Sequence, residues 1–230
     1  MKQATERRGR AQVLLVDDHP IVRERLAQLI NQQSGLAVCG ECEDAPTCLS
    51  LIEKHKPHLV IVDLSLRGTH GIELIKDIIA RQPEQPILVL SMHDESVFAE
   101  RALRAGARGY ITKHEATDQV MLAIRRVLDG QIYLSDKMAA QLVSVFIHGR
   151  KKDATSPIER LTDRELEVFQ MIGQGRTTRQ IAEALKLDVK TVETYRYRMK
   201  EKLNVESASE LLQHAIQLAQ SDSTGGSTPP

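Results

Sequence analysis

The chain has 230 residues, which is enough for two domains of ordinary size that each bury a core. Its 31 Lys and Arg residues balance 31 Asp and Glu residues, so the composition gives no indication of a polyanionic partner. There is no apolar run of about 18 residues and no basic leader followed by an apolar segment, so we expect a cytoplasmic protein with neither a membrane span nor a secretory signal.

From residue 11 to about residue 130, apolar runs of strand length alternate with stretches of helical period. Five strands alternating with five helices predict a doubly wound parallel sheet, because parallel neighbours need crossover helices. The run Leu-Val-Ile-Val over residues 59–62 indicates a strand buried on both faces. The expected helices lie around residues 21–30, 48–52, 72–79, 97–103 and 120–128.

The three cysteines, Cys39, Cys42 and Cys48, fit a reducing compartment. Cys39 and Cys42 have the spacing of a redox or zinc half-site. They lie in an expected strand, however, and no second pair is present to complete four metal ligands. We therefore interpret all three as structural residues.

A second, all-helical domain follows a linker. Residues 136–149 have the pattern of an amphipathic helix, and the polar stretch that follows to Pro157 has the composition of an interdomain linker. Four helices are expected from Leu161 onward, the first opened by a capping box of Thr162 and Glu165 and the last capped by Ser207. Residues 221–230 are rich in Ser, Thr, Gly and Pro, which predicts a disordered tail.

Polar residues follow four of the strands, at the edge of the sheet where ligands bind in open α/β folds. Three carboxylates at one edge repel each other unless a cation joins them, and hard oxygen ligands suit Mg²⁺. The nearby ammonium suits a phosphoryl oxygen, so we predict a magnesium and phosphoryl site, with a structural ion-pair cluster as the alternative. The residues are Asp17, Asp18, Asp63, Ser91 and Lys113.

The order and spacing of these residues, within Asp17–Pro20, Asp63, Ser91–His93 and Tyr110–Lys113, resemble the receiver domain of two-component response regulators. The resemblance covers about residues 11–130 and implies a flavodoxin-like α/β fold with a phosphohistidine on a sensor histidine kinase as the phosphoryl donor. It implies that Asp63 is the phosphoacceptor. It also implies that Mg²⁺ binds to Asp17, Asp18, Asp63 and the backbone carbonyl of Ser65, that Lys113 pairs with the phosphoryl group, and that Ser91 and Tyr110 are switch residues.

One loop departs from this family. Most receivers carry Met-Pro at the third and fourth positions after the phosphoacceptor, whereas this chain has Leu66 and Arg67. The loop loses the stiffness of proline and gains a guanidinium near Asp63. Our hypothesis is that Arg67 alters phosphoryl lifetime or kinase choice; the alternative is a solvated loop arginine.

The second domain resembles the LuxR-type helix-turn-helix of NarL/FixJ-type regulators, through Leu161–Val168, Gly175, Ile181–Leu185, Thr191–Tyr195 and Lys202–Leu203. In the third helix an apolar stripe must face the domain core, and the opposite face is the one a recognition helix lays in the major groove. The stripe is Val192, Tyr195, Met199 and Leu203. The candidate DNA contacts are Arg179, Lys190, Thr191, Glu193, Thr194, Tyr197, Arg198 and Lys202, with Glu193, Thr194 and Tyr197 directed at bases; the alternative is a solvated helix face.

We therefore predict a phosphorylation-dependent DNA-binding transcription regulator, not an enzyme, that binds double-stranded DNA as a homodimer paired through its last helix. Its parts are a receiver domain (11–131), a helical linker (132–158), a helix-turn-helix domain (159–220) and a tail (221–230). One alternative is a phosphohydrolase with an aspartyl-phosphate intermediate, which is disfavoured because Ser65 stands where a general acid would be needed. Another is a phosphate-independent DNA-binding regulator whose receiver is a dimerisation module.

Overall fold

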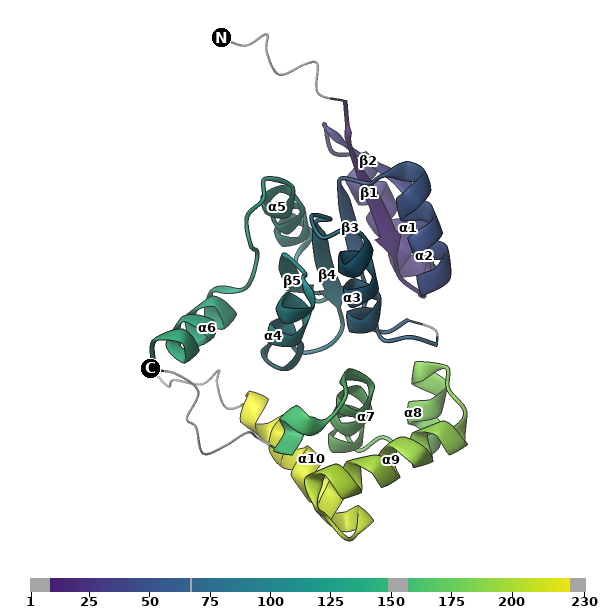
Figure 1. Cartoon of the computed structure of the whole chain (residues 1–230), viewed down its shortest axis with the longest axis vertical. Coiled ribbons are helices and arrows are strands. Elements are labelled where there is room, and N and C mark those ends of the chain that lie inside the picture. Colours follow the sequence, from purple (N-terminus) through teal and green to yellow (C-terminus); the bar gives the residue numbers. More distant parts are fainter. Residues whose placement is uncertain (1–8, 67, 149–156, 224–230) are drawn as a thin grey trace. The chain divides into compact units, whose positions relative to one another are not determined.

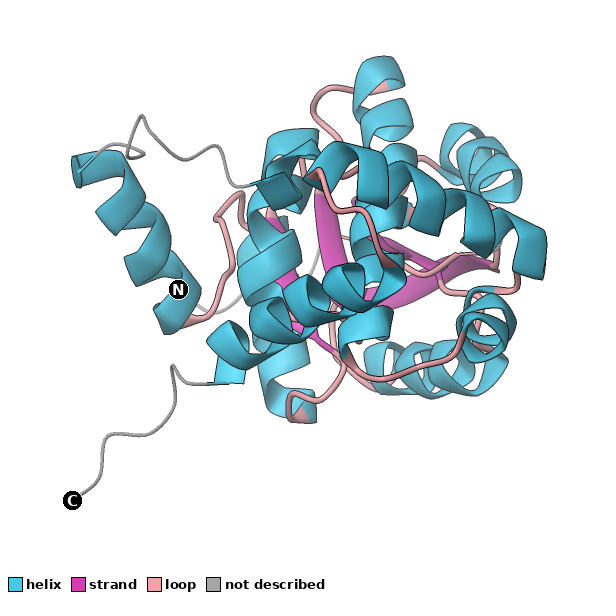
Figure 2. Cartoon of the chain, turned by 90° about the horizontal axis from the view of Figure 1, so that it is seen from below, coloured by secondary structure: helices cyan, strands magenta, loops and turns pink. Residues whose placement is uncertain are grey.

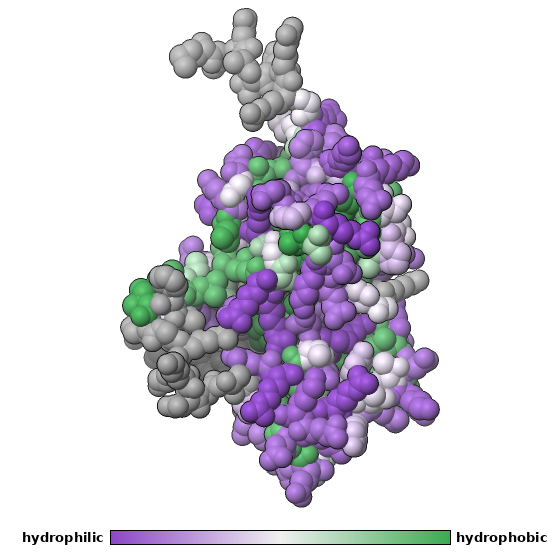
Figure 3. Space-filling view, in the orientation of Figure 1, coloured by the Kyte–Doolittle hydropathy of each residue, from purple (hydrophilic) through white to green (hydrophobic). Residues whose placement is uncertain are grey.

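The computed structural model describes residues 9–66, 68–148 and 157–223 (Figure 1). It divides into two compact units, Met1–Val145 and Phe146–Pro230. No helix in the described ranges is long and apolar enough to cross a membrane. The described surface visible in Figure 3 is mostly hydrophilic, with apolar side chains scattered in small groups.

The first unit is built on a five-stranded parallel sheet, which Figure 2 shows with helices on both sides. The strand order is β2-β1-β3-β4-β5, so the direction of winding reverses between β1 and β3. All four residues of β3 are buried, which confirms the strand predicted to be covered on both faces. The strands are β1 (Ala11–Val16), β2 (Leu36–Cys42), β3 (Leu59–Val62), β4 (Ile87–Ser91) and β5 (Gly109–Thr112).

Five helices cover the two faces of this sheet, as the sequence predicts. Buried residues of α1 and α5 share one apolar cluster with alternate residues of the strands, which places these two helices on the same face. Side chains at the intervening strand positions, such as Leu14, Val60 and Tyr110, are also buried and point to the other face. The helices are α1 (Pro20–Asn31), α2 (Ala45–His55), α3 (Gly71–Arg81), α4 (Glu95–Ala105) and α5 (Thr117–Leu128).

After α5 the chain runs along the open edge of the sheet. Tyr133 forms a parallel bridge with Gly109, donating its N–H to the carbonyl of Arg108 at 3.0 Å and accepting from the N–H of Tyr110 at 3.0 Å. The helix α6 (Asp136–His148) begins three residues later. We call residues 131–135 the edge segment. Through Tyr133 it pairs with backbone groups of Arg108 and Tyr110 that the outer edge of the sheet would otherwise leave open.

The second unit is entirely helical in its described residues. Its elements are the short 3₁₀ helix η1 (Pro157–Arg160) followed by α7 (Asp163–Gly173), α8 (Thr178–Leu185), α9 (Val189–Leu203) and α10 (Ala208–Ser223). The capping box of Thr162 and Glu165 is present, and the hydroxyl of Ser207 accepts the N–H of Glu210 at 3.1 Å. Thr177 and Gln180 form a second capping box at the start of α8.

The end of α10 differs from expectation. The helix continues to Ser223, three residues into the segment that composition assigned to a tail, and residues 224–230 lie outside the described chain. Its buried face packs on α7. A Cβ atom at Gly173 would lie 2.4 Å from the carbonyl oxygen of Ala215, so this close approach requires glycine.

Candidate functional site

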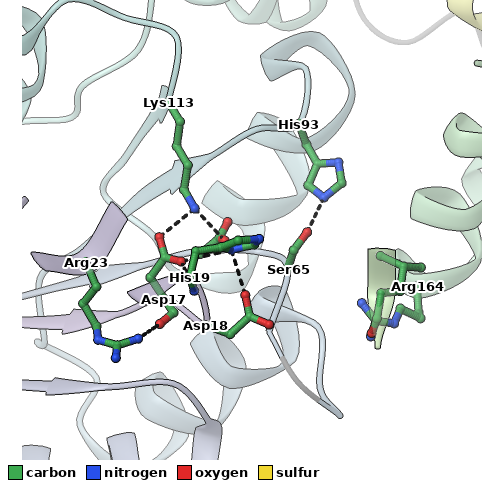
Figure 4. Close-up of polar contacts among 10 residues, drawn as sticks. Asp17, Asp18, His19, Arg23, Ser65, His93, Lys113 and Arg164 are labelled. Atoms are coloured by element: carbon green, nitrogen blue, oxygen red, sulfur yellow. Dashed lines mark hydrogen bonds and ion pairs between the residues drawn. The ribbon is translucent and has the colours of Figure 1, made fainter. Parts of the chain in front are cut away.

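Four of the predicted polar residues meet at the carboxyl edge of the sheet, where Figure 4 shows Asp17, Asp18 and Lys113 close together. Asp17 and Asp18 follow β1, Asp63 follows β3 and Lys113 follows β5. The Lys113 Nζ lies 2.6 Å from Asp17 Oδ2 and 2.8 Å from Asp63 Oδ2. All three aspartates are buried, and Asp63 is only 2% exposed. The structure thus brings together four residues that are up to 96 positions apart in sequence.

Backbone pairing continues past the strand ends and holds these side chains in place. The N–H of Asp63 donates to the carbonyl of Val16 at 2.8 Å, and the N–H of Asp17 donates to Cys42 at 3.1 Å. The N–H of Lys113 donates to the carbonyl of Ser91 at 2.8 Å. The pocket is therefore fixed by the sheet itself, at the point where the strand order reverses.

The electrostatics of the pocket are dominated by burial. Burial raises the pKa of Asp63; Lys113 opposes this rise only in part, and the nearby charge of Asp17 adds to it. Burial alone would lower the pKa of Lys113, but the carboxylates of Asp63 and Asp17 outweigh it and raise that pKa. Asp63 Oδ1 is buried and has no hydrogen-bond partner among the described residues. One oxygen of this carboxylate is thus held by an ammonium and the other is available.

The donor set fits a hard divalent cation. Asp17, Asp18, His19 and Asp63 each place one potential ligand atom within 4.8 Å of the others. Three of the four are carboxylates, which suit Mg²⁺ better than a soft metal. His19 is not among the metal ligands predicted from the sequence; its Nδ1 lies 2.9 Å from Asp18 Oδ1, and its side chain is 52% exposed. The sequence signal that could have identified His19 as a possible ligand is its position directly after Asp18.

The expected switch residues lie beside this pocket. Ser91 is fully buried, and its hydroxyl accepts the N–H of His93 at 3.2 Å. Tyr110 is also fully buried, with its hydroxyl donating to the carbonyl of His93 at 3.0 Å, and burial raises its pKa above the usual range. The side chain of Ser65 contacts His93, with 2.9 Å between Oγ and Nε2, an interaction the sequence did not predict. Arg67 lies outside the described residues.

In the second unit, the two faces of α9 differ as predicted. Val192, Met199 and Leu203 of the apolar stripe are buried, while Tyr195 is half-buried. Thr191 is half-buried as well. The candidate DNA contacts that are exposed are Arg179, Lys190, Glu193, Thr194, Tyr197 and Arg198.

Lys202 is engaged within the domain. Its Nζ lies 2.6 Å from Glu165 Oε2, and the Glu165 side chain is 2% exposed. Burial opposes ionisation of this carboxyl group, but the bonds from Lys202 and Thr162 outweigh it and lower the pKa of Glu165. The ion pair gives Lys202 a structural role, which is a reason to leave it out of the set of DNA contacts.

Comparison with known proteins assigns both units. The model of the response regulator receiver domain matches residues 13–125, and that of the LuxR family of bacterial regulatory proteins matches residues 159–215. The chain is 35% identical to the response regulator GacA of Pseudomonas aeruginosa over 204 residues, covering 89% of this chain and 94% of GacA. The chain belongs to the LuxR-type response regulators of two-component systems.

Other members of the family are similar over the same length. The oxygen regulatory protein NreC of Staphylococcus carnosus is 34% identical, with 89% of this chain and 96% of NreC covered. The structure of RcsB from Salmonella enterica serovar Typhimurium, bound to the promoter rprA with the phosphomimetic BeF₃⁻, aligns with a TM-score of 0.59 and 26% identity, covering 90% of this chain and 98% of RcsB.

Family membership confirms the predicted fold class and function. Response regulators of this type are DNA-binding transcription regulators rather than enzymes, and control by phosphorylation is the rule among them. Receiver domains bind Mg²⁺ at the acidic pocket, and the corresponding cluster of Asp17, Asp18 and Asp63 is present here. A receiver implies a kinase as phosphoryl donor, and a LuxR-type domain implies binding to DNA.

Proposed function

We propose that Asp63 accepts a phosphoryl group from a sensor histidine kinase. The observation that carries this proposal is that the two carboxylate oxygens of Asp63 differ in their hydrogen bonding. Oδ2 is held by Lys113 at 2.8 Å, whereas Oδ1 is buried with no hydrogen-bond partner among the described residues. A buried oxygen that nothing satisfies is costly, and its presence is expected where a ligand or reactant completes the site.

The surrounding residues have separate roles in this proposal. Asp17, Asp18 and Asp63, with the backbone carbonyl of Ser65, hold Mg²⁺, which neutralises charge on the transferred phosphoryl group when bound. The Lys113 ammonium, already between two carboxylates, pairs with a phosphoryl oxygen. Ser91 and Tyr110 then respond to the new charge, because a phosphoryl group adds up to about two negative charges and several acceptor oxygens.

We also propose that α9 is the recognition helix. Its exposed face presents Glu193, Thr194 and Tyr197 to base edges, while Lys190 and Arg198, with Arg179 on α8, contact phosphates. RcsB, which is similar along nearly its whole length, was solved bound to promoter DNA. Thr191 is half-buried and serves at most at the margin of the contact.

The active form is proposed to be a homodimer on DNA. On α10, Leu211 and Ala215 are buried inside the unit, whereas Leu212 is 37% exposed and is available to a second copy. RcsB has been solved as dimers bound to DNA. The proposed boundaries are a receiver at 11–131, a linker at 132–158 and a DNA-binding domain from 159, now extended through Ser223.

The experiment measures phosphorylation and DNA binding in the same full-length chains. Wild type, Asp63→Asn and the exposed α3 control Asp77→Asn are incubated with acetyl phosphate and Mg²⁺, and the modified peptide is located by mass spectrometry. We expect modification at Asp63 in wild type and Asp77→Asn alone. Modification elsewhere would contradict the assignment of the phosphoacceptor.

Binding is then measured on duplexes selected from a random pool, with and without beryllofluoride. The proposal predicts that beryllofluoride raises affinity and dimer content for wild type and Asp77→Asn but not for Asp63→Asn. Equal affinity and equal assembly in all three proteins would instead favour a receiver that serves only as a dimerisation module.

A further inference from the structure

The residues at the start of α6 supply only half of a capping box. Ser135 is the N-cap residue: its hydroxyl accepts the N–H of Met138 at 3.1 Å and its carbonyl accepts the N–H of Ala139 at 2.9 Å. A capping box would also need Glu or Gln three residues after Ser135, to accept the N–H of the N-cap residue. That position is Met138, an apolar side chain only 3% exposed.

The missing carboxylate comes from a different helix. The N–H of Ser135 donates to Glu95 Oε1 at 3.0 Å, and Glu95 is the first residue of α4. The starts of α4 and α6 also line one hollow, to which Ser96 contributes from α4 and Lys137 and Gln141 contribute from α6. The cap of the linker helix is therefore shared between two elements 40 residues apart in sequence.

The same contact is tied to the switch residues. The hydroxyl of Tyr110 holds the carbonyl of His93, in the loop that leads directly into Glu95. The backbone N–H of Tyr110 donates to Tyr133, in the edge segment that leads directly into Ser135. Tyr110 thus anchors both sides of the Glu95–Ser135 contact, and a displacement of the loop from β4 to α4 would have to stretch it.

We propose that Glu95 is a positioning residue that couples the receiver to the linker helix through this split capping box. While the loop from β4 to α4 stays where it is, Glu95 caps α6 and keeps its first turn formed. Movement of that loop toward a phosphoryl group on Asp63 withdraws the carboxylate and loosens the start of the linker helix. The second half of this inference rests on the proposed phosphorylation of Asp63; the first half does not.

Hydrogen exchange on the full-length chain tests both halves. Glu95→Asp keeps the negative charge in the first turn of α4 but is one methylene too short to reach Ser135. Glu95→Gln keeps the reach and the acceptor oxygen. Glu100→Ala removes another carboxylate of α4, one that pairs with Arg104 a turn away in the same helix, and serves as the control.

Without a phosphoryl analogue, amides of residues 138–141 should exchange about fivefold faster in Glu95→Asp, the effect of losing a typical helix cap. Glu95→Gln and Glu100→Ala should exchange as wild type. Wild-type exchange in Glu95→Asp would overturn the split capping box. So would equally fast exchange in Glu95→Gln, because the effect would then come from lost charge.

With beryllofluoride and Mg²⁺, the same amides should exchange faster in wild type and change little in Glu95→Asp. Unchanged wild-type exchange alongside new protection around Asp63 would overturn the coupling. Absence of protection around Asp63 would count against the phosphorylation site itself, and the comparison without beryllofluoride would still decide the role of Glu95.

Discussion

Replacing Asp63 by Asn should stabilise the first unit in the absence of divalent cations. The substitution keeps the shape of the side chain and removes one negative charge from a buried cluster of three carboxylates and one ammonium. Functional residues commonly lower the stability of the folded protein, and the distances in this pocket allow the size of that effect to be calculated for Asp63.

The magnitude follows from the distances. Potential ligand atoms of Asp17, Asp18 and Asp63 lie within 4.8 Å of one another, and like charges at that separation repel by roughly 3.5 kcal/mol at an effective dielectric constant of about 20. Asp63 meets two such charges, while Lys113 at 2.8 Å attracts it by roughly 6 kcal/mol on the same scale. The repulsion from the two carboxylates and the attraction to Lys113 nearly cancel, so nothing compensates the cost of desolvating the Asp63 carboxylate. We expect Asp63→Asn to raise the free energy of unfolding by about 2 kcal/mol.

Native-state hydrogen exchange of the amides in β1 and β3 measures this free energy for the first unit alone. A gain of this size corresponds to roughly thirtyfold slower exchange in Asp63→Asn, and Asp77→Asn should match wild type. Addition of Mg²⁺ should stabilise wild type more than the variant, because the variant has lost a ligand. Exchange in Asp63→Asn that is faster than wild type without Mg²⁺ would refute the reasoning.

The same experiment has a pH dependence of known sign. The pKa of Asp63 is raised in the folded state above its ordinary value of 3.8, so between these two values the folded chain binds more protons than the unfolded chain. Stability of wild type therefore falls as pH rises through this window. The advantage of Asp63→Asn should be complete above the raised pKa and should disappear as pH falls below 3.8.

Three further substitutions test other contacts. Gly71→Ala should destabilise the first unit by roughly 3 kcal/mol, because its Cβ would lie 2.3 Å from the backbone oxygen of Asp63; an unchanged melting temperature would contradict this. Lys202→Met should lower the free energy of unfolding of the second unit by roughly 2 kcal/mol in urea at neutral pH, less than for a fully buried ion pair because Lys202 is one-third exposed. The difference from wild type should shrink as acid protonates Glu165. No loss of stability would return Lys202 to the candidate DNA contacts. Lys190→Ala should reduce the slope of log affinity against log salt by about 1, with Lys76→Ala on α3 as the unaffected control.

Much of the site could be predicted because its geometry follows from strand order. Residues directly after parallel strands share one edge of the sheet, so Asp17, Asp63 and Lys113 had to converge once their strands were recognised. The contact between Ser65 and His93 could not be foreseen in this way. Both residues lie in loops, whose paths depend on packing that no local pattern encodes.

Among the contacts at helix starts, too, the local ones could be predicted and those between distant residues could not. The boxes at Thr162 and Thr177 are local, and the first was predicted from residues three positions apart. The bond from Ser135 to Glu95 and the pair of Lys202 with Glu165 join residues 40 and 37 positions apart. A count of basic residues on α9 made Lys202 a candidate DNA contact but gave no indication of its pairing with Glu165. Sequence does not show which side chains of a neighbouring helix lie within reach.

The edge segment also determines where the receiver can be cut. A fragment ending with α5 would lose Tyr133 and leave the N–H of Tyr110 and the carbonyl of Arg108 open along an outer strand. Such groups are a template for pairing with another sheet, so the shortened fragment should aggregate at concentrations where one ending after Ser135 stays monodisperse. The edge segment that follows α5 thus protects the outer strand of the sheet from fibrous self-association.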